Sequence, residues 1–460
     1  MDYIKKEDVE YLVFEGGGGA GNAFPGALNA LEELKILQFD NNNKVAGKIK
    51  GFGGASAGAI NALFLSLGYS PSEMQTILDQ NNFEDFFDKP DTTYRPYIFT
   101  AKKSTKVKDD LDKLAKELEQ GIFGNILKHC FGWILSNRAI SSLAWGTIAA
   151  GYTMLSYFFG AALSAITIVM MGKMPQKMLK QIKDNLKQSR VQFALLFHYG
   201  IFPAFTFRHF LNKYIKLAVN RVGASGISGD EITIGGVKKK IQDINFADHE
   251  KIFGVKLIVT GTNLETMKSV QFSSLTTPNF PIADAVRISM SIPMAFQPLI
   301  LRDDNDLRKV IKSGENPKNH FLKGVWVDGG LLNNAPVGAF DQIAGTHTKT
   351  LALRLRQDER TNIETVFDFF KIYPLSLGLM GTGEAYIDNA ASTFDRTINI
   401  NVKNSEMDLF DFKVDTGTFK TVNNRSNKTV KDFFASAAAV QRIKDEAQKT
   451  GSGEYPVNDL

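Results

Sequence analysis

The sequence predicts an α/β sandwich whose central sheet is mostly parallel. Three observations predict this fold class. Short apolar segments with the composition of buried strands recur along the chain, the first of them end in glycine-rich turns, and helical patterns follow those turns. Helices that alternate with strands carry the chain back across a sheet, so that successive strands run in the same direction.

The first strand-and-helix unit surrounds a run of glycines near the N-terminus. Residues 9–15 have the pattern of a strand, Gly16 to Gly21 follow as a turn, and residues 25–34 have the pattern of a helix with leucines on one face. Such a turn presents free backbone N–H groups beside a helix N-terminus, and this arrangement binds negative charge. The charge is either a ligand phosphate or the oxyanion that forms during acyl transfer.

The same turn admits a second interpretation, as a nucleotide site. Gly16, Gly18 and Gly21 satisfy the dinucleotide-binding pattern Gly-x-Gly-x-x-Gly, and Asp40 lies where an acid would bind the ribose. This interpretation leaves the two motifs described next without a role. A P-loop is excluded, because no Gly-Lys-Ser or Gly-Lys-Thr follows the glycines.

The second unit contains a candidate nucleophile. Ser56 lies in Gly54-Ala55-Ser56-Ala57-Gly58, between a predicted strand at residues 49–53 and a predicted buried helix at residues 57–67. A nucleophilic serine on a sharp strand-to-helix turn has a strained backbone, and the residues two positions away on either side must lack bulk. Gly54 and Gly58 meet that requirement, although short runs of this pattern also occur by chance.

The third unit contains a candidate base. Residues 255–261 are a predicted buried strand, and residues 325–327 are a short strand that leads into Asp328-Gly329-Gly330. An aspartate in this setting serves as a general base or simply forms a turn, since Asp-Gly favours tight turns.

These motifs, in this order, resemble the patatin-like phospholipases. Their pattern is a glycine-rich oxyanion turn, a Gly-x-Ser-x-Gly elbow and a distal Asp-Gly-Gly or Asp-Gly-Ala. Residues 284–298 and residues 328–336 are also similar to the family, and the resemblance covers roughly residues 9–95 and 195–345. The resemblance implies a three-layer α/β/α sandwich with a central, mostly parallel sheet, to which this chain adds a helical, apolar insertion.

The resemblance also implies a serine–aspartate dyad without a catalytic histidine. Ser56 would attack an ester carbonyl, Asp328 would accept its proton, and water would then hydrolyse the acyl-enzyme. The backbone N–H groups of Gly17, Gly18 and Gly19 would form the oxyanion hole, supported by Gly16, Gly21, Gly54, Gly58, Gly329 and Gly330. The expected activity is that of a phospholipase A or lysophospholipase, with a phospholipid membrane as partner and without a metal or other cofactor.

One position departs from the family pattern. The family usually has Arg or Lys before the last glycine of the oxyanion turn, and this chain has Ala20. The backbone donors do not depend on that side chain, so the oxyanion hole is expected to survive. The departure nevertheless leaves a second hypothesis open, a catalytically impaired protein that binds lipid or nucleotide on the same fold.

The motifs divide the chain into four regions. Residues 1–99 form the N-terminal half of the catalytic core, and residues 100–192 form a lysine-rich and then apolar insertion. Residues 193–345 form the C-terminal half of the core. Residues 346–460 form a mixed region that is expected to pack on the core, and residues 350–355 within it are a predicted strand.

The insertion contains the longest apolar run of the chain. No charged side chain occurs from Ala139 to Gly172, which is long enough for a membrane span. A single span would separate Ser56 from Asp328 across the bilayer, which contradicts the chemistry. A hairpin in one leaflet, an apolar lid and a helix packed within the protein all remain, and we favour membrane contact.

A basic stretch follows the apolar run. Its cations recur at intervals of three and four residues, on one side of a helix: Lys173, Lys177, Lys180, Lys183, Lys187 and Arg190. This pattern describes either a solvated helix face or a segment that meets anionic lipid. No nucleic-acid-binding motif accompanies it, so no nucleic-acid partner is expected.

Composition sets broader bounds. The chain has 460 residues, 43% of them hydrophobic, a net charge of +5 and a single cysteine, Cys130. One cysteine excludes an intramolecular disulfide framework. No signal peptide is visible, so a cytoplasmic or peripheral membrane location is expected, with leaderless export and a protein activator left open.

Overall fold

The computed structural model describes residues 4–81, 83–88, 199–223, 228–311, 320–356, 395–403, 406–407 and 414–450. Within these ranges the strands are β1 Tyr11–Phe14, β2 Gln38–Phe39, β3 Val45–Ala46, β4 Gly51–Gly54, β5 Gly200–Phe202, β6 Glu231–Ile234, β7 Val237–Lys240, β8 Lys256–Asn263, β9 Lys268–Ser273, β10 Met294–Phe296, β11 Leu299–Leu301, β12 Gly324–Asp328, β13 Thr350–Arg356 and β14 Thr397–Asn401. The α-helices are α1 Phe24–Glu33, α2 Ala57–Ser66, α3 Pro71–Gln80, α9 Phe205–Arg221, α10 Phe246–Phe253, α11 Ile282–Ser289, α12 Asp304–Val310, α13 Gly330–Asn333, α14 Asp341–Ala344 and α18 Thr416–Thr450. Short 3₁₀ helices include η1 Gly18–Ala23 and η2 Phe83–Phe86.

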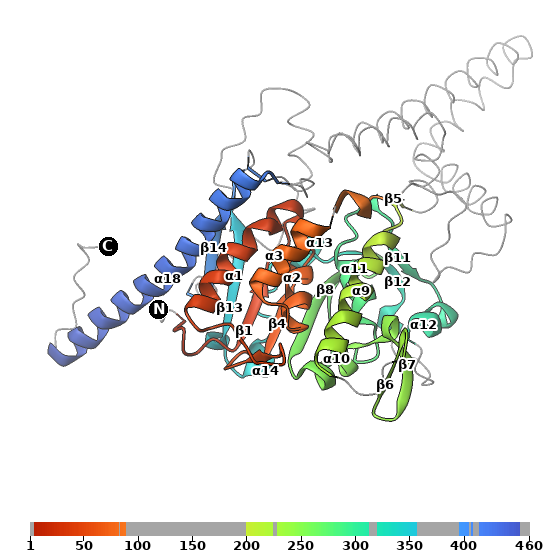
Figure 1. Ribbon diagram of the computed structural model, residues 1–460, viewed down its shortest axis with the longest axis horizontal. Coiled ribbons are helices and arrows are strands. Elements are labelled where there is room, and N and C mark those ends of the chain that lie inside the picture. Colours follow the sequence, from red (N-terminus) through yellow and green to blue (C-terminus); the bar gives the residue numbers. More distant parts are fainter. Residues whose placement is uncertain are drawn as a thin grey trace, which may run out of the picture.

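A mostly parallel sheet forms the centre of the described structure (Figure 1). Its strand order is β11-β12-β8-β4-β1-β13-β14, and β9 pairs with β8 as an eighth strand. The five strands β8, β4, β1, β13 and β14 run parallel to one another, whereas β12, β11 and β9 add antiparallel pairs on one side. The predicted fold class, an α/β sandwich with a mostly parallel centre, is confirmed.

The strand β1 shows how the sheet is buried on both faces. Leu12 and Phe14 belong to the larger hydrophobic cluster, whereas Tyr11 and Val13 belong to a separate cluster on the opposite face. Successive side chains of a strand point to opposite faces, so both faces of this strand are covered. A central parallel strand therefore consists of a continuous apolar run and not of an alternating pattern.

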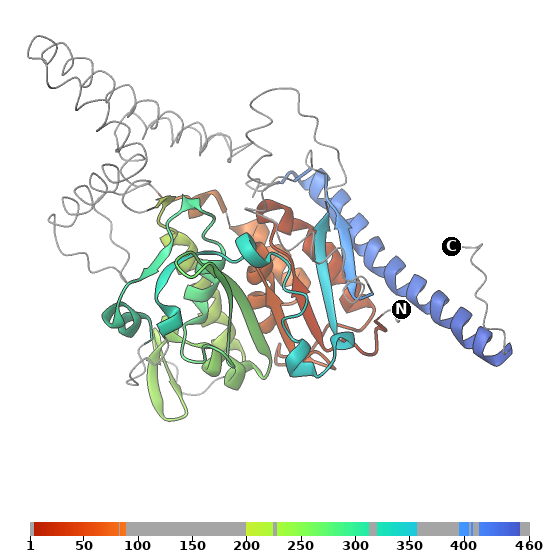
Figure 2. The same ribbon diagram turned by 180° about the vertical axis from the view of Figure 1, so that it is seen from behind.

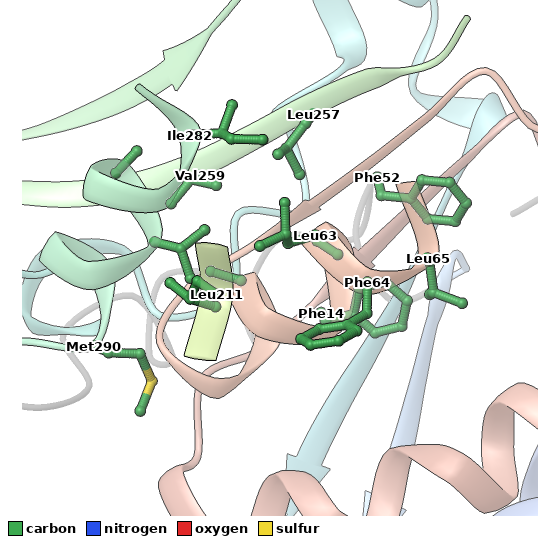
Figure 3. Close-up of a cluster of buried hydrophobic side chains, with 14 of the residues drawn as sticks. Phe14, Phe52, Leu63, Phe64, Leu65, Leu211, Leu257, Val259, Ile282 and Met290 are labelled. Carbon is green, nitrogen blue, oxygen red and sulfur yellow. The ribbon is translucent and has the colours of Figure 1, made fainter. Parts of the chain in front are cut away.

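The two covering layers differ in thickness. The helices α1, α2, α3, α9, α10 and α11 lie on one face (Figure 1). Figure 3 shows Leu63, Phe64 and Leu65 of α2 in the buried cluster of this layer. Among the described residues, less chain covers the other face, where α13 lies near one end of the strands and α14 near the other (Figure 2). Phe340, just before α14, stacks on Tyr11 there, with a distance of 4.5 Å between ring centroids.

Several predicted elements are found close to their expected bounds. The strand predicted at residues 255–261 is β8, the strand predicted at residues 350–355 is β13, and the helix predicted after Ser56 is α2. A capping box also starts α3: the Ser70 hydroxyl accepts from the Glu73 N–H at 3.3 Å and the Glu73 carboxylate accepts from the Ser70 N–H at 2.8 Å. These are local signals, which a sequence carries directly.

The region beyond residue 345 contributes to the sheet itself. β13 pairs with β1, and β14 forms the edge beside β13. The long helix α18 packs on α1 (Figure 1). The two helices are in direct contact at Gly26 of α1, whose N–H donates to Asn423 Oδ1 of α18 at 2.6 Å. A Cβ atom on Gly26 would lie only 2.1 Å from the Asn423 carbonyl oxygen, so this contact requires glycine.

The apolar run from Ala139 to Gly172 and the basic stretch after it lie outside the described residues. Among the helices that are described, none combines the length and the apolar character that crossing a bilayer requires.

Candidate active site

Strand register brings the three motifs to one edge of the sheet. β1 and β4 run parallel with Phe14 opposite Gly54, so the glycine-rich turn and the turn that contains Ser56 leave the sheet side by side. β8 continues past the end of β4 and pairs with the antiparallel β12, where Gly261 lies opposite Asp328. The carboxyl edge of a parallel sheet is where α/β proteins place their sites.

Ser56 lies on a strained turn between β4 and α2. Its backbone has φ 50° and ψ −125°, a conformation that non-glycine residues rarely adopt. A Cβ atom on Gly54 would lie 2.3 Å from the Gly58 carbonyl oxygen, and one on Gly58 would lie 2.3 Å from the Phe14 carbonyl oxygen. The turn therefore closes only with glycine at both positions, as the sequence pattern predicts.

The structure brings Ser56 and Asp328 into direct contact. The Ser56 hydroxyl donates to Asp328 Oδ2 at 2.8 Å, across a sequence separation of 272 residues. Both side chains are buried, with 5% and 4% of their surfaces exposed. The predicted pair thus has the spacing that proton transfer from a nucleophile to a base requires.

Burial changes the acidity of Asp328. Removal of the carboxylate from water raises its pKa from 3.8 to about 7, and two hydrogen bonds oppose this effect. One is donated by the Gly330 N–H at 2.7 Å and the other by Ser56. A carboxylate with a pKa near 7 is a far better base at neutral pH than an ordinary aspartate.

The glycine-rich turn lies beside Ser56. A Cβ atom on Gly16 would lie 2.8 Å from the Ser56 Cβ, and Gly18 has φ +52° at the start of η1. Ala20 donates its N–H to the Gly17 carbonyl at 3.0 Å. Within the described part of the chain, no protein acceptor is found for the N–H groups of Gly17, Gly18 and Gly19.

The structure adds residues to the site that motif reasoning assigned no role. Asn334 contacts the glycine-rich turn, Ser289 accepts from the Ser56 N–H at 2.8 Å, and Met290 Sδ lies 3.6 Å from Ser56 Oγ. All three lie in the two stretches, residues 284–298 and 328–336, that support the family resemblance. That resemblance was the available signal, but it did not say what the side chains contact.

An apolar pocket opens beside Ser56. The empty space within it, open mouth included, is about 860 Å³. Gly18, Ala57 and Met290 line it next to Ser56, and aromatic side chains make up much of the rest: Phe64, Phe86, Phe87, Phe207, Phe210 and Phe296. These come from α2, η2, α9 and β10 and from loops that no single motif identifies.

Other candidate groups have structural roles instead. His249 is fully buried, bonds to the Ser66 hydroxyl at 2.8 Å, and has its pKa lowered to about 4 by burial. Asp40, the alternative ribose ligand, lies in the turn between β2 and β3, where its Oδ1 accepts from the N–H groups of Asn42 and Lys44 at 2.8 Å each. This carboxylate closes a hairpin.

Comparison with known proteins gives a family match. The model of a family described as "Patatin-like phospholipase" matches residues 12–136 and 154–341. An uncharacterized protein of Acanthamoeba polyphaga mimivirus is 29% identical over 181 residues, which is 39% of this chain and 52% of that protein. The uncharacterized protein YqhO of Bacillus subtilis (strain 168) is 30% identical over 149 residues, which is 29% of this chain and 45% of that protein. The chain spans about half the length of these curated relatives.

Two bacterial proteins of known structure are also similar. VipD from Legionella pneumophila aligns with a TM-score of 0.43 and 17% identity, over 94% of this chain and 67% of VipD. The type III effector ExoU, known from Pseudomonas aeruginosa in complex with SpcU, aligns with a TM-score of 0.34 and 14% identity, over 94% of this chain and 53% of ExoU.

Proposed function

Because this chain belongs to the patatin-like phospholipase family, we propose that it hydrolyses carboxylic ester bonds of membrane phospholipids, with Ser56 as nucleophile and Asp328 as base. The family membership supports lipid hydrolysis in general. The observation that most supports these two residues is the 2.8 Å hydrogen bond from the Ser56 hydroxyl to Asp328 Oδ2.

The proposed reaction has two half-reactions. Ser56 Oγ attacks the ester carbonyl carbon while its proton passes to Asp328, and the tetrahedral intermediate then expels the alcohol, which takes up that proton. In the second half-reaction Asp328 accepts a proton from water, and the resulting hydroxide attacks the acyl-enzyme. The fatty acid leaves and Ser56 Oγ regains the proton.

The glycine-rich turn supplies the proposed oxyanion hole. Negative charge develops on the former carbonyl oxygen in both half-reactions, and hydrogen bonds that strengthen there lower the barrier. The N–H groups of Gly17, Gly18 and Gly19 have no protein acceptor within the described ranges, and the turn that carries them begins at Gly16, which lies against Ser56; both observations support this role.

The apolar pocket supports an acyl substrate. Burial of one CH₂ group contributes about 0.8 kcal/mol, so a fatty acyl chain binds strongly to a wall of Phe and Met side chains. The pocket reaches Ser56 through Ala57 and Met290. An acyl chain in this pocket therefore places its ester end at the nucleophile.

The experiment is release of fatty acid from vesicles of mixed anionic phospholipids. We expect release by the unaltered protein and loss of release in Ser56→Ala and Asp328→Asn. Ser426→Ala is the matched control, because the Ser426 hydroxyl is also buried but donates to the Val422 carbonyl of its own helix, α18. Retained release in Ser56→Ala would contradict the proposed nucleophile.

A second candidate function is lipid binding without turnover. The observation that favours it is Ala20, which is 5% exposed and belongs to the hydrophobic core where the family usually has a cation. Under this alternative, vesicle binding persists while neither the unaltered protein nor Ser56→Ala releases fatty acid. An intact enzyme that lacks an activating partner would also release no fatty acid. A fluorophosphonate distinguishes the two cases, because it labels Ser56 in an intact site and does not label an impaired one.

A further inference from the structure

A single turn of chain contacts both members of the dyad. Ser289 is the last residue of α11, and Met290 and Ser291 follow it. The Ser289 hydroxyl oxygen accepts from the Ser56 N–H at 2.8 Å, and the Ser291 carbonyl accepts from the Asp328 N–H at 2.9 Å. The backbones of nucleophile and base are therefore both held by one three-residue segment, although they lie far apart in the sequence.

The contact at Ser56 is made where the chain is most strained. Ser56 has φ 50° at the junction between the end of β4 and the start of α2, a conformation that costs free energy in a residue other than glycine. The Ser56 N–H is buried, and a buried donor requires an acceptor. Ser289 supplies it from a side chain with no exposed surface, so water does not replace the contact readily.

The turn is itself fixed by a buried network. Arg287, two residues before Ser289 in α11, donates from Nη2 to the carbonyls of Pro203 and Gln297, at 3.1 Å each. The Ser291 hydroxyl donates to the Arg287 carbonyl at 2.9 Å. Arg287 is 4% exposed, so its charge is held by these carbonyls inside the protein and cannot move without leaving them.

A second buried contact fixes the start of the same helix. Arg208 of α9 donates to both carboxylate oxygens of Asp284, with distances of 2.7 and 3.2 Å. The bidentate geometry sets the rotation of α11 as well as its position. The end of α11 is therefore a rigid support for the two residues that it contacts.

We propose that Ser289 is a positioning residue for catalysis, which holds the strained Ser56 backbone so that Oγ faces the ester carbonyl and Asp328 together. This inference rests on the proposed function of Ser56 and Asp328. Ser289 acts through the Ser56 N–H and has no part in proton transfer. Its loss lets the elbow relax toward ordinary φ values, which moves Oγ out of line with its base.

The consequences for kinetics are specific. A small displacement of a nucleophile costs up to about 100-fold in rate. Ser289→Ala is expected to lower kcat by about 10- to 100-fold, with KM unchanged. KM stays because Ser289 does not line the acyl pocket, which remains intact.

The test measures turnover of a soluble fatty-acid ester by the full chain, with each variant normalised to the fraction of sites that a fluorophosphonate titrates. Four variants are compared: Ser289→Ala, Ser289→Thr, Ser289→Cys and the control Ser426→Ala. Threonine keeps the oxygen acceptor, whereas cysteine keeps the size and replaces oxygen with a weak acceptor. If Ser289→Ala does not fold, Ser289→Cys carries the same comparison with less change in packing.

The expected result is a lower kcat per titrated site in Ser289→Ala and Ser289→Cys, and recovery in Ser289→Thr. A variant that loses titratable sites but keeps the full rate at each remaining site overturns the proposal, because it shows a purely structural role. A changed KM with an unchanged kcat per titrated site also overturns it, since Ser289 would then act on the acyl pocket and not on the nucleophile. Ser56→Ala in the same assay distinguishes failure of this inference from failure of the proposed function. Residual activity in Ser56→Ala would contradict the role of Ser56 as nucleophile. If Ser56→Ala is inactive and the unaltered protein is active, the activity of Ser289→Ala tests the positioning role.

Discussion

Gly16 and Asn334 are joined by two hydrogen bonds that connect the glycine-rich turn to the loop after Asp328. The Gly16 N–H donates to the Asn334 carbonyl and the Asn334 Nδ2 donates to the Gly16 carbonyl, both at 3.0 Å. A Cβ atom on Gly16 would lie 2.4 Å from Asn334 Oδ1, so the approach requires glycine. The proposed oxyanion donors are thereby held at a fixed position relative to the proposed base.

Asn334→Ala is expected to lower kcat by about 10-fold while KM changes little, because the side-chain contact that orients the oxyanion turn is lost. The measurement is steady-state hydrolysis of a fatty-acid ester. Asn333→Ala is the matched control. Asn333 accepts a hydrogen bond from the Thr260 hydroxyl through its backbone carbonyl, which the substitution to alanine keeps. Equal losses in the two variants would contradict a specific role for Asn334.

Activity is expected to fall as the pH drops below about 7. Burial raises the pKa of Asp328 to about 7, and only the deprotonated carboxylate accepts the proton of Ser56. The logarithm of kcat/KM should therefore rise with unit slope below that midpoint and level off above it. The second-order rate constant for labelling of Ser56 by a fluorophosphonate, measured at each pH, should show the same dependence on pH. A rate constant that stays at its plateau value down to pH 5 would contradict the assignment of Asp328 as the base.

Asp328→Asn is expected to stabilise the fold at pH 8 while it abolishes activity. A raised pKa means that the folded state favours the protonated carboxyl, so this contribution to stability is complete below about pH 4 and is lost as the pH rises through about 7. The shift corresponds to on the order of 4 kcal/mol, at about 1.4 kcal/mol per pH unit, as an upper limit. Asparagine is neutral at every pH, so the variant does not lose stability through ionisation of a buried carboxyl.

Urea unfolding of Asp328→Asn and the unaltered protein at pH 4 and pH 8 measures the difference. The free energy of unfolding of Asp328→Asn should exceed that of the unaltered protein by more at pH 8 than at pH 4. A gap that does not depend on pH would show that the carboxylate is ionised without penalty in the folded state.

Ile60→Trp is expected to change the preference for acyl chain length. Ile60 lines the pocket one turn after Ser56 and is partly exposed, so a larger side chain fills cavity space without displacing the core. Hydrolysis of a long-chain ester should fall by about 10-fold or more, because the buried CH₂ groups lose their space. A short-chain ester serves as the internal control, and equal losses for both would place the acyl chain elsewhere.

The sequence predicted the turns and helix starts because each of them depends on residues that are close together in the chain. Gly54 and Gly58 are required by the turn that they flank, and the start of α3 is marked by Ser70 and Glu73 within four residues. The apolar runs predicted β8 and β13 in the same way. Contacts of this kind depend on backbone geometry over a few residues, which sequence patterns record.

The partners of Ser56 could not be read in this way. Ser289 and Asn334 are polar residues in stretches that support the family resemblance, but which groups they contact depends on how α11 and the loop after β12 lie against the sheet. The pocket likewise combines side chains from α2, α3, η2 and α9. Nothing in the spacing of those segments says that they share one cavity.

The sequence by itself determined the strand-to-helix turns, the order of the motifs and the pair of residues that chemistry would use. The tertiary structure decided how these parts meet: the 2.8 Å contact between Ser56 and Asp328, and the burial that raises the pKa of that carboxyl to about 7. The physical reason is the range of the interactions. Turn geometry is fixed by adjacent residues, whereas desolvation and register depend on every strand and helix packed around the site.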